Sequence, residues 1–407
     1  MSRYTPFEWI AAMRFMREGL VQTLLIIVGV GLGVAVIVFM SAALAGMQAN
    51  IIRRTLNYMA PIVVIPPQQI ARPLRESAGR TAALVQPRSQ QLRSIDQWQK
   101  VRAQIERLAD VIAVTPVVNG PGFAVRGDAN KAVNITGIEP ETYLKVIALA
   151  DRIVAGRLSV ASSDIIIGTE LAKDLGTDIR DKLRLTTASG ASQTLNVTGI
   201  FDFGNKRVNE TNVYINLHVA QSLLDLVGGA SSLEIKVRDP FEAETIAQAI
   251  QSETGQEADS WIKTNAQFFT AMAAQTLTNR LIRFFVGLTA ALGIASVLVV
   301  SVVQKSKEIG ILRAMGTSRG QVLRLFLLQG AVMALVGSLF GSALSFVFLA
   351  FFRSIAKNPD GTLMFIIEID APLLMVTAVG ATLVGILAAV LPARLAAQLD
   401  PAVAIRG

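Results

Sequence analysis

The chain has 407 residues, of which 52% are hydrophobic and only 17% charged, and its formal net charge is +8. A mean hydropathy of +0.49 is too apolar for an ordinary soluble globular protein. The lack of cysteine excludes a disulfide scaffold, and a chain of this length can bury a sufficient core without one.

The first 19 residues predict a short amphipathic helix that lies at the membrane surface. Within residues 4–17, Phe7, Ile10 and Phe15 offer apolar contacts, and Trp9 suits the level of the lipid headgroups. We therefore expect 1–19 to be a cytoplasmic amphipathic helix that leads into the first apolar stretch.

Four stretches without ionisable side chains are each long enough to cross a bilayer, at about 20–44, 284–303, 325–352 and 372–392. They predict four transmembrane helices over 20–45, 281–303, 325–352 and 371–393. A rival interpretation of the first is a cleavable signal peptide, with Arg14 and Arg17 before it and "ALAG" at its end. The apolar run is too long for a typical signal core, so an uncut anchor is favoured.

Basic residues next to the predicted spans gather on one side of the membrane, which the positive-inside rule places in the cytoplasm. These residues are Arg3, Arg14, Arg17, Lys305, Lys307, Arg313, Arg319, Arg324, Arg394 and Arg406. The rule predicts a multi-pass membrane protein with both termini inside, 46–280 and the loop 353–370 on the outer side, and a cytoplasmic tail 394–407. The positive charge is then explained by membrane lipids and topology, and no nucleic-acid partner is expected.

The long outer segment 46–280 predicts a mixed α/β domain. "PIVVI" at 61–65 is typical of a strand, 66–94 of a mobile loop, and apolar spacing from Ile95 to about Asp110 of a helix. Strands are predicted at "AVTPVV", "GFAVRG", "AVNITGI", "DIII", "KLRLTT", "TLNVTGIF", "NVYIN", "SLEIKV" and "ADSWI", with helices between several of them. Strand–helix–strand pieces at both ends indicate one α/β subdomain interrupted by a more β-rich insertion. A long helix over 264–280 should lead directly into the second span.

The sequence lacks the usual signatures of catalysis. There is no phosphate-binding G-x-x-x-x-G-K-[ST] loop, no G-x-S-x-G and no H-E-x-x-H, and the single His218 has no companion ligands. We expect no catalytic residues, no metal site and no cofactor in this chain. Carriers driven by protons or ions usually keep an ionisable side chain inside the bilayer, and these spans have none. Energy should therefore come from a partner.

Small residues indicate close helix contacts. Gly29 and Gly33 are four residues apart, as are Gly337 and Gly341. This spacing lets helix backbones approach closely, and we expect Gly29 and Gly33 to pack against a helix of this chain or of a second copy.

"KEIGILRAMGTSRGQVLRLF" at 307–326 separates two apolar spans, and its residues predict a bent helix pair. Ile309, Leu312 and Met315 share one helical face, to which Ile311 adds. Gly316 is a favourable residue just past a helix end. Thr317 or Ser318 can begin the next helix, and Ser318 with Gln321 fits a capping box. Residues 304–324 thus predict a docking surface just inside the membrane.

This stretch resembles the segment between the second and third spans of FtsX-like permeases, the superfamily of type VII ABC transporters that includes the MacB and LolC/LolE types. The C-terminal "LPARLAAQLDPAVAIRG" resembles the family's ending at Pro392, Ala393, Ala396, Asp400, Pro401 and Arg406. The resemblance implies four transmembrane helices in the bacterial inner membrane, with a large periplasmic α/β domain over 46–280, of porter-like and sabre-like subdomains, between spans one and two. The loop 353–370 would then be periplasmic as well. It also implies an ATPase-coupling helix that involves Glu308, Gly310, Arg313, Ala314, Met315, Gly316 and Arg319.

The resemblance further implies a non-catalytic permease subunit that works by mechanotransmission. ATP and Mg would be bound by a separate cytoplasmic ABC ATPase, and a second permease copy or homologue would complete a dimer. MacB carries a fused ATPase ahead of its first span, whereas this chain starts almost at the membrane, as the separate permeases do. Two substrate classes stay open: efflux with a periplasmic adaptor and an outer-membrane duct, or lipoprotein extraction with a lipoprotein chaperone. A third alternative is an FtsX-like signalling protein that regulates cell-wall hydrolases.

Overall fold

The computed structural model describes residues 7–67, 72–73, 76–77, 80–81, 84–85, 92–95, 97–357 and 367–399. The chain divides into two compact units. One, the helical unit, comprises Met1–Asn50 and Ala271–Gly407, and the other, the α/β unit, comprises Ile51–Thr270. Each is described by itself below.

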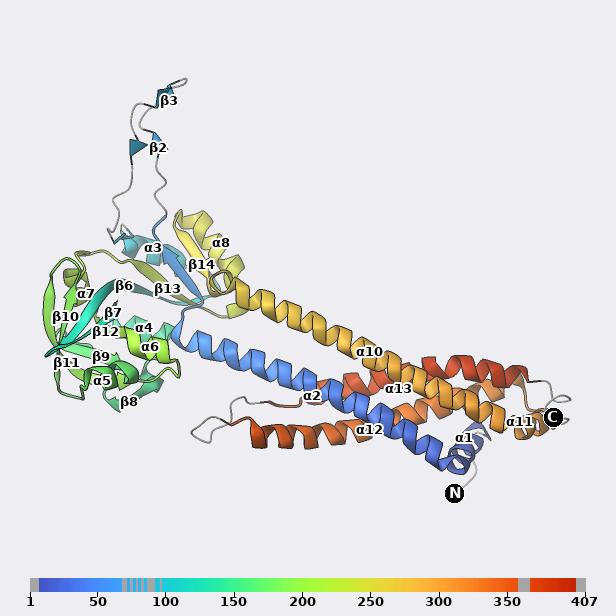
Figure 1. The fold of residues 1–407 in the computed structure, drawn as a ribbon. Helices are drawn as coiled ribbons and strands as arrows, with labels where there is room; N and C mark the ends of the chain where they lie inside the picture. The colour runs from blue at the N-terminus through green and yellow to red at the C-terminus, as the bar shows by residue number, and fades with distance from the viewer. Residues whose placement is uncertain are drawn as a thin grey trace. The chain divides into compact units, whose positions relative to one another are not determined.

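Long apolar helices make up the helical unit (Figure 1). Its helices are α1 (Phe7–Glu18), α2 (Leu20–Tyr58), α10 (Ala266–Gln304), α11 (Ser306–Ala314), α12 (Arg319–Ile355) and α13 (Ala371–Gln398), of which α2 and α10 continue past the unit's boundaries. Four of them, α2, α10, α12 and α13, are long and apolar enough to cross a membrane. They contain the four predicted spans, and their length and composition support a membrane protein.

The outer surfaces of these helices are rich in exposed apolar side chains. Leu25 on α2, Phe284 on α10 and Leu387 on α13 are all more than half exposed. Exposure of so large an apolar surface to water is unfavourable, whereas contact with lipid tails, which are equally apolar, is not. The buried side chains lie between the helices instead, around Phe326 and Leu298.

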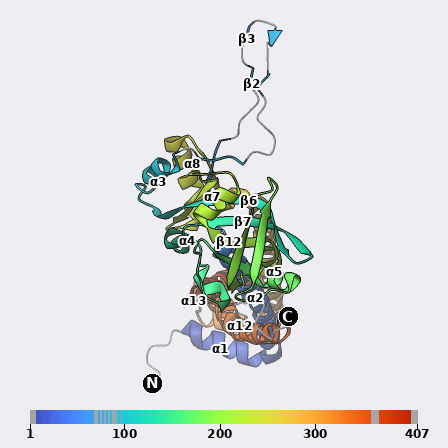
Figure 2. The same ribbon diagram turned by 90° about the vertical axis from the view of Figure 1, so that its left-hand side faces the viewer.

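The α/β unit contains a ten-stranded mixed sheet with short helices around it (Figure 2). Its strands are β1 (Ile62–Ile65), β6 (Val111–Arg126), β7 (Ala129–Ile138), β8 (Ile153–Gly156), β9 (Asp164–Gly168), β10 (Lys182–Thr187), β11 (Ser192–Phe201), β12 (Asn212–Asn216), β13 (Ser232–Val237) and β14 (Glu257–Ser260). Its helices are α3 (Trp98–Ile105), α4 (Pro140–Val146), η1 (Ala150–Arg152), α5 (Thr169–Leu175), α6 (Lys206–Thr211), α7 (Leu217–Leu223), η2 (Pro240–Glu242), α8 (Ala243–Thr254) and α9 (Trp261–Thr264).

Six strands of this sheet close into a ring of pairings. Their order is β10–β11–β9–β12–β7–β6, and β10 also pairs with β6, with Arg184 opposite Val125. Apolar side chains that include Ile135, Ile165 and Leu185 form a buried core with these strands. The β-rich insertion that the sequence predicts would comprise these strands. It is not a separate sheet, because the other end of β6 pairs with β13 and so joins the ring to β1 and β14.

Strands β1 and β14 hold the two ends of the unit together. They are antiparallel neighbours, with Ile62 opposite Ser260. In sequence, β1 follows α2 almost directly, and only α9 separates β14 from α10. The predicted closing strand at "ADSWI" is β14 as far as Ser260, whereas its last two residues, Trp261 and Ile262, belong to α9. The helix predicted over 264–280 lies in α10, which begins at Ala266.

Two local predictions in this unit need correction. "AVTPVV" and "GFAVRG" belong to one strand, β6, because its ladder with β7 continues through Gly120, Pro121 and Gly122. Gly122 does not mark a turn. A Cβ there would lie 2.5 Å from Ile135 Cδ1, so glycine allows a close approach across the sheet. The helix predicted from Ile95 starts later, at Trp98, because Ile95 instead forms a β-bridge with Ala230.

The loop predicted over 66–94 falls largely outside the described residues. Within it, β2 (Arg72–Pro73) pairs with β5 (Leu84–Val85), and β3 (Glu76–Ser77) pairs with β4 (Arg80–Thr81). Asp400, Pro401 and Arg406 of the C-terminal pattern also lie outside the described residues. Pro392, Ala393 and Ala396 of the same pattern are buried in α13.

Candidate functional site

The segment between α10 and α12 forms the bent helix pair that the sequence predicts. Helix α11 ends at Ala314, and Gly316 follows with φ of +103°. The Thr317 amide donates to the Leu312 carbonyl and the Gly316 amide to the Arg313 carbonyl, each at 3.1 Å, which is the Schellman pattern. Ser318 then begins α12 in a capping box with Gln321. Backbone groups are satisfied on both sides of the turn, so the bend is a defined structure.

The apolar face predicted for α11 is divided between the inside and the outside of the unit. Ile309 is buried, Gly310 is buried beside it, and Leu312 packs against the same core. Ile311 is half exposed, and Met315 is 72% exposed. The prediction of a single apolar face is therefore wrong for Met315. At the end of α11 the axis bends and the side chain points away from the core.

Arg313 contacts its own chain. Its guanidinium donates a hydrogen bond to the main-chain carbonyl of Leu399, at the end of α13. The side chain is half-buried there, whereas Ala314, Gly316 and Arg319 are exposed. Of the residues that the resemblance implicates, Gly310 and Arg313 thus support α11 from within, and the others face outward.

An ion-pair network joins α11 to α1. Lys305, between α10 and α11, pairs with Glu18 at the end of α1 and with Glu308 at 2.9 Å, and Arg14 pairs with Glu18 at 2.9 Å. Hydrogen bonds from Lys305 and Arg14 lower the pKa of Glu18, and those from Glu18 and Glu308 raise the pKa of Lys305. The Lys305 ammonium also lies 5.7 Å from the centre of the Phe15 ring. Glu308 is therefore part of a link to α1 as well as of the outer surface.

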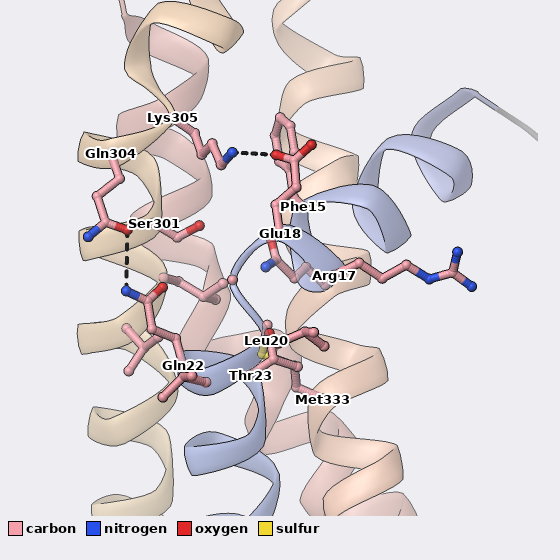
Figure 3. Close-up of a pocket in the computed structure, with 15 residues that line it drawn as sticks. Phe15, Arg17, Glu18, Leu20, Gln22, Thr23, Ser301, Gln304, Lys305 and Met333 are labelled. Carbon is pink, nitrogen blue, oxygen red and sulfur yellow. Dashed lines mark hydrogen bonds and ion pairs between the residues drawn. The ribbon is translucent and has the colours of Figure 1, made fainter.

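Sequence reasoning missed the α1 side of this arrangement. Figure 3 shows Glu18 next to Lys305, and Gln22 at the start of α2 reaching Gln304 at 3.2 Å. These pairs join residues that are more than 280 positions apart, so no local pattern reveals them. The sequence did predict that Phe15 makes an apolar contact, and its side chain is buried in the helical core.

The glycines of α12 pack as their spacing predicts, and of the two predicted α2 glycines Gly33 packs within the described chain whereas Gly29 does not. A Cβ on Gly337 would lie 2.9 Å from Val30, and one on Gly341 would meet the Gly31 carbonyl oxygen. The α2 partner is thus Gly31, which lies between the two predicted glycines. Gly33 approaches Val286 of α10, whereas a Cβ on Gly29 would meet nothing within 4 Å among the described residues. The packing prediction is wrong for Gly29 within this chain, and its role toward a second copy stays a prediction.

The described residues contain no group of three or more His, Asp or Glu side chains that could hold a metal ion. His218 lies at the start of α7, where Nδ1 is 3.0 Å from Gln221 Oε1. Nothing in its surroundings resembles a ligand set.

Two family models match the chain. The MacB-like periplasmic core domain matches residues 23–253, more than half of the chain, and the FtsX-like permease C-terminal model matches residues 280–401. The chain belongs to the FtsX-like permease family. The second match contains the whole bent helix pair, so this FtsX-like permease carries it inside a region that the family shares.

Curated relatives of this FtsX-like permease are permease proteins of ABC transporters. The lipoprotein-releasing system transmembrane protein LolC of Xylella fastidiosa (strain 9a5c) is 23% identical over 93% of this chain and 92% of its own length. LolC of Neisseria meningitidis is 26% identical over 60% of this chain, which spans 62% of that relative. The macrolide export ATP-binding/permease protein MacB of Acinetobacter baylyi is 25% identical over 72% of this chain and 46% of its own length. Among solved structures, the periplasmic region of MacB from Actinobacillus actinomycetemcomitans is 13% identical over 54% of this chain and 98% of that one, with a TM-score of 0.35.

Proposed function

We propose that this chain is the membrane subunit of an ABC transporter and that a separate cytoplasmic ATPase drives it through the α11–α12 bend. The observation that carries the proposal is the rigid bend itself. Schellman and capping-box hydrogen bonds fix the turn, while Ile311, Met315 and Arg319 remain exposed around it. An apolar side chain that is 72% exposed beside a cation is a suitable contact for a protein partner.

The proposed mechanism is mechanotransmission. ATP and Mg bind to the partner ATPase, and its closure pushes on α11. Buried Ile309, the Arg313 hydrogen bond to Leu399 and the Lys305–Glu18 ion pair connect α11 to the rest of the helical unit. A push on the bend is then passed to α13 and α1 together. In this proposal both termini are cytoplasmic, the α/β unit is periplasmic with porter-like and sabre-like parts, and a second permease copy or homologue completes a dimer.

The test compares one exposed residue at the bend with one elsewhere. Met315→Asp places a charge where the partner would dock, and we expect at least a tenfold loss of ATPase stimulation in the reconstituted complex. Val227→Asp is the matched control, because Val227 is an exposed apolar residue of the α/β unit, at 84%. Both variants should insert into membranes normally. Unchanged stimulation in Met315→Asp would contradict the docking assignment.

For the substrate, we propose a lipid-anchored protein that is extracted from the outer leaflet. Support comes from the LolC relative that matches nearly end to end, whose name describes lipoprotein release. The test reconstitutes the complex in liposomes with a lipoprotein and measures its ATP-dependent transfer to a soluble lipoprotein chaperone. Transport of a macrolide through an adaptor and duct instead would favour efflux. ATP hydrolysis that activates a cell-wall hydrolase and moves no cargo would favour signalling.

A further inference from the structure

Helices α1 and α11 lie at the same end of the helical unit, and a groove separates their side chains (Figure 1). Its volume is about 320 Å³. The α1 wall includes Phe7, Ile10 and Arg14, and the α11 wall consists of Glu308, Ile311 and Leu312. The groove is therefore mainly apolar, and it carries one charge of each sign.

The apolar side chains of the groove are open to solvent. Phe7 is 44% exposed, Ile10 57% and Ile311 49%. Met315, the most exposed apolar residue of the bend, lies one helical turn beyond Ile311, to whose carbonyl its amide donates. Contiguous exposed apolar surface of this kind marks an interaction site. The groove thus continues the surface of the bend from α11 onto α1.

The groove lies on the opposite side of α1 from Trp9. Successive residues of an α-helix are about 100° apart, so Trp9 lies about 160° around the helix from Phe7. With Trp9 at the level of the lipid headgroups, the groove side of α1 faces the cytoplasm. Glu18, which pairs with Arg14 and Lys305, lies on the groove side as well. Such a charged layer favours contact with water or protein over contact with lipid tails.

The charges of the groove favour a protein over a lipid headgroup. The side chains of Arg14 and Glu308 are 75% and 46% exposed. Glu308 would repel a phosphate, whereas a protein can present an acidic group to Arg14 and a basic group to Glu308. The exposed Lys307 and Arg319 add positive charge next to the bend. The matching partner surface is therefore acidic overall, with an apolar side chain at its centre.

We infer that the groove receives an apolar side chain of the ATPase subunit, which makes α1 a direct contact of that subunit. The inference rests on the proposed function, in which the ATPase docks at the bend. The incoming side chain lies between Ile10 and Ile311. Because the Lys305–Glu18 ion pair joins the two walls, a partner held by both walls moves α1 and α11 together.

The first experiment places the photocrosslinker p-benzoylphenylalanine at single positions of the full chain and irradiates membranes that contain the whole complex. At Ile10 we expect a crosslink to the ATPase subunit. Trp9 is the matched control, because it is the adjacent residue and lies away from the groove, and there we expect crosslinks to lipid only. At Ile10, crosslinks only to lipid, to a second copy or to another part of this chain would overturn the inference.

The same crosslinker at Met315 separates this inference from the proposed function. A crosslink from Met315 to the ATPase subunit without one from Ile10 would overturn the groove as a contact and leave the bend as the docking site. Lack of an ATPase crosslink at both positions would contradict the proposed function and the inference together.

The second experiment measures the affinity of the purified permease for the ATPase subunit by titration in detergent. Ile10→Asp places a charge where the apolar side chain should enter, and we expect binding to weaken roughly fivefold or more. Ile112→Asp is the matched control, because Ile112 is also 57% exposed but lies on β6 of the α/β unit. Both variants should keep the wild-type melting temperature. Equal affinities in the two variants would overturn the inference.

Discussion

The guanidinium of Arg313 donates a hydrogen bond to the carbonyl oxygen of Leu399, which ties α11 to the end of α13. Helix carbonyls in the last turn lack partners within the helix, and a cation at that end also favours the helix dipole. The contact therefore stabilises the end of α13 while it holds α11 in place. It also gives Arg313 a role that does not depend on a partner protein.

Arg313→Gln should loosen this end of α13. A hydrogen bond from a charged group contributes about 1.5–3 kcal/mol to stability. Because the Arg313 side chain is half exposed, we expect the substitution to cost an amount of stability near the lower figure. Hydrogen–deuterium exchange of Ala393–Gln398 in the purified chain should become several-fold faster. Arg319→Gln is the control, because Arg319 is exposed and should leave this exchange unchanged. Slow exchange in Arg313→Gln would contradict the contact.

Gly316 should not tolerate a side chain. Its φ of +103° lies in the left-handed half of the backbone map, where a β-branched residue is strained by about 1–3 kcal/mol. Gly316→Val should lower the melting temperature and weaken ATPase stimulation together, because the turn reorients Met315. Gly320→Ala tests the reason: Gly320 lies inside α12, and a Cβ there reaches only Ser318 Oγ at 4.0 Å. That variant should melt at or slightly above the wild-type temperature.

Gly341 and Gly29 predict opposite responses to alanine. A methyl group on Gly341 would meet the Gly31 carbonyl oxygen and lies 2.8 Å from Val34, so α2 and α12 must move apart. Overpacking of this kind costs about 1–3 kcal/mol. Gly29→Ala meets no neighbour in the described chain and should be neutral or slightly stabilising. Thermal unfolding of both variants in the same detergent checks the pair, and equal melting temperatures would contradict the packing.

Glu234 predicts a pH dependence in the α/β unit. It lies on β13 between Val63 of β1 and Thr115 of β6, and burial raises its pKa from 4.5 to about 7. A raised folded-state pKa stabilises the fold fully below pH 4.5, and this contribution is lost as the pH rises through about 7. Glu234→Gln should therefore match the wild type at low pH and be more stable at pH 8 by up to about 3 kcal/mol. Melting curves from pH 5 to 8.5, followed by the fluorescence of buried Trp261, measure this.

The bend between α11 and α12 could be predicted because its signals are local. Gly316 ends one helix, and Ser318 with Gln321 caps the next, through hydrogen bonds between residues at most five positions apart. Such hydrogen bonds depend only on the local sequence. The alternation of apolar residues likewise predicted most strands of the α/β unit. The direction in which Met315 and Arg313 point was not predictable, since it depends on where α13 ends.

The remaining features that the sequence did not predict are contacts between residues far apart in the chain. Spacing identifies a glycine pair, but it cannot say which side of α2 faces which helix. Gly31 makes the contact with α12, Gly33 approaches Val286 of α10, and Gly29 meets no described residue. The pairing of β10 with β6 joins residues about 60 positions apart, and no local pattern encodes it.

The pairing of β1 with β14 joins the two strands through which the chain enters and leaves the sheet. One strand follows α2 and the other precedes α10, and four residue pairs join them, from Ile62 opposite Ser260 to Ile65 opposite Glu257. Any force that separates these two strands must break the antiparallel ladder between them. The points at which the chain enters and leaves the sheet are therefore held at a fixed spacing.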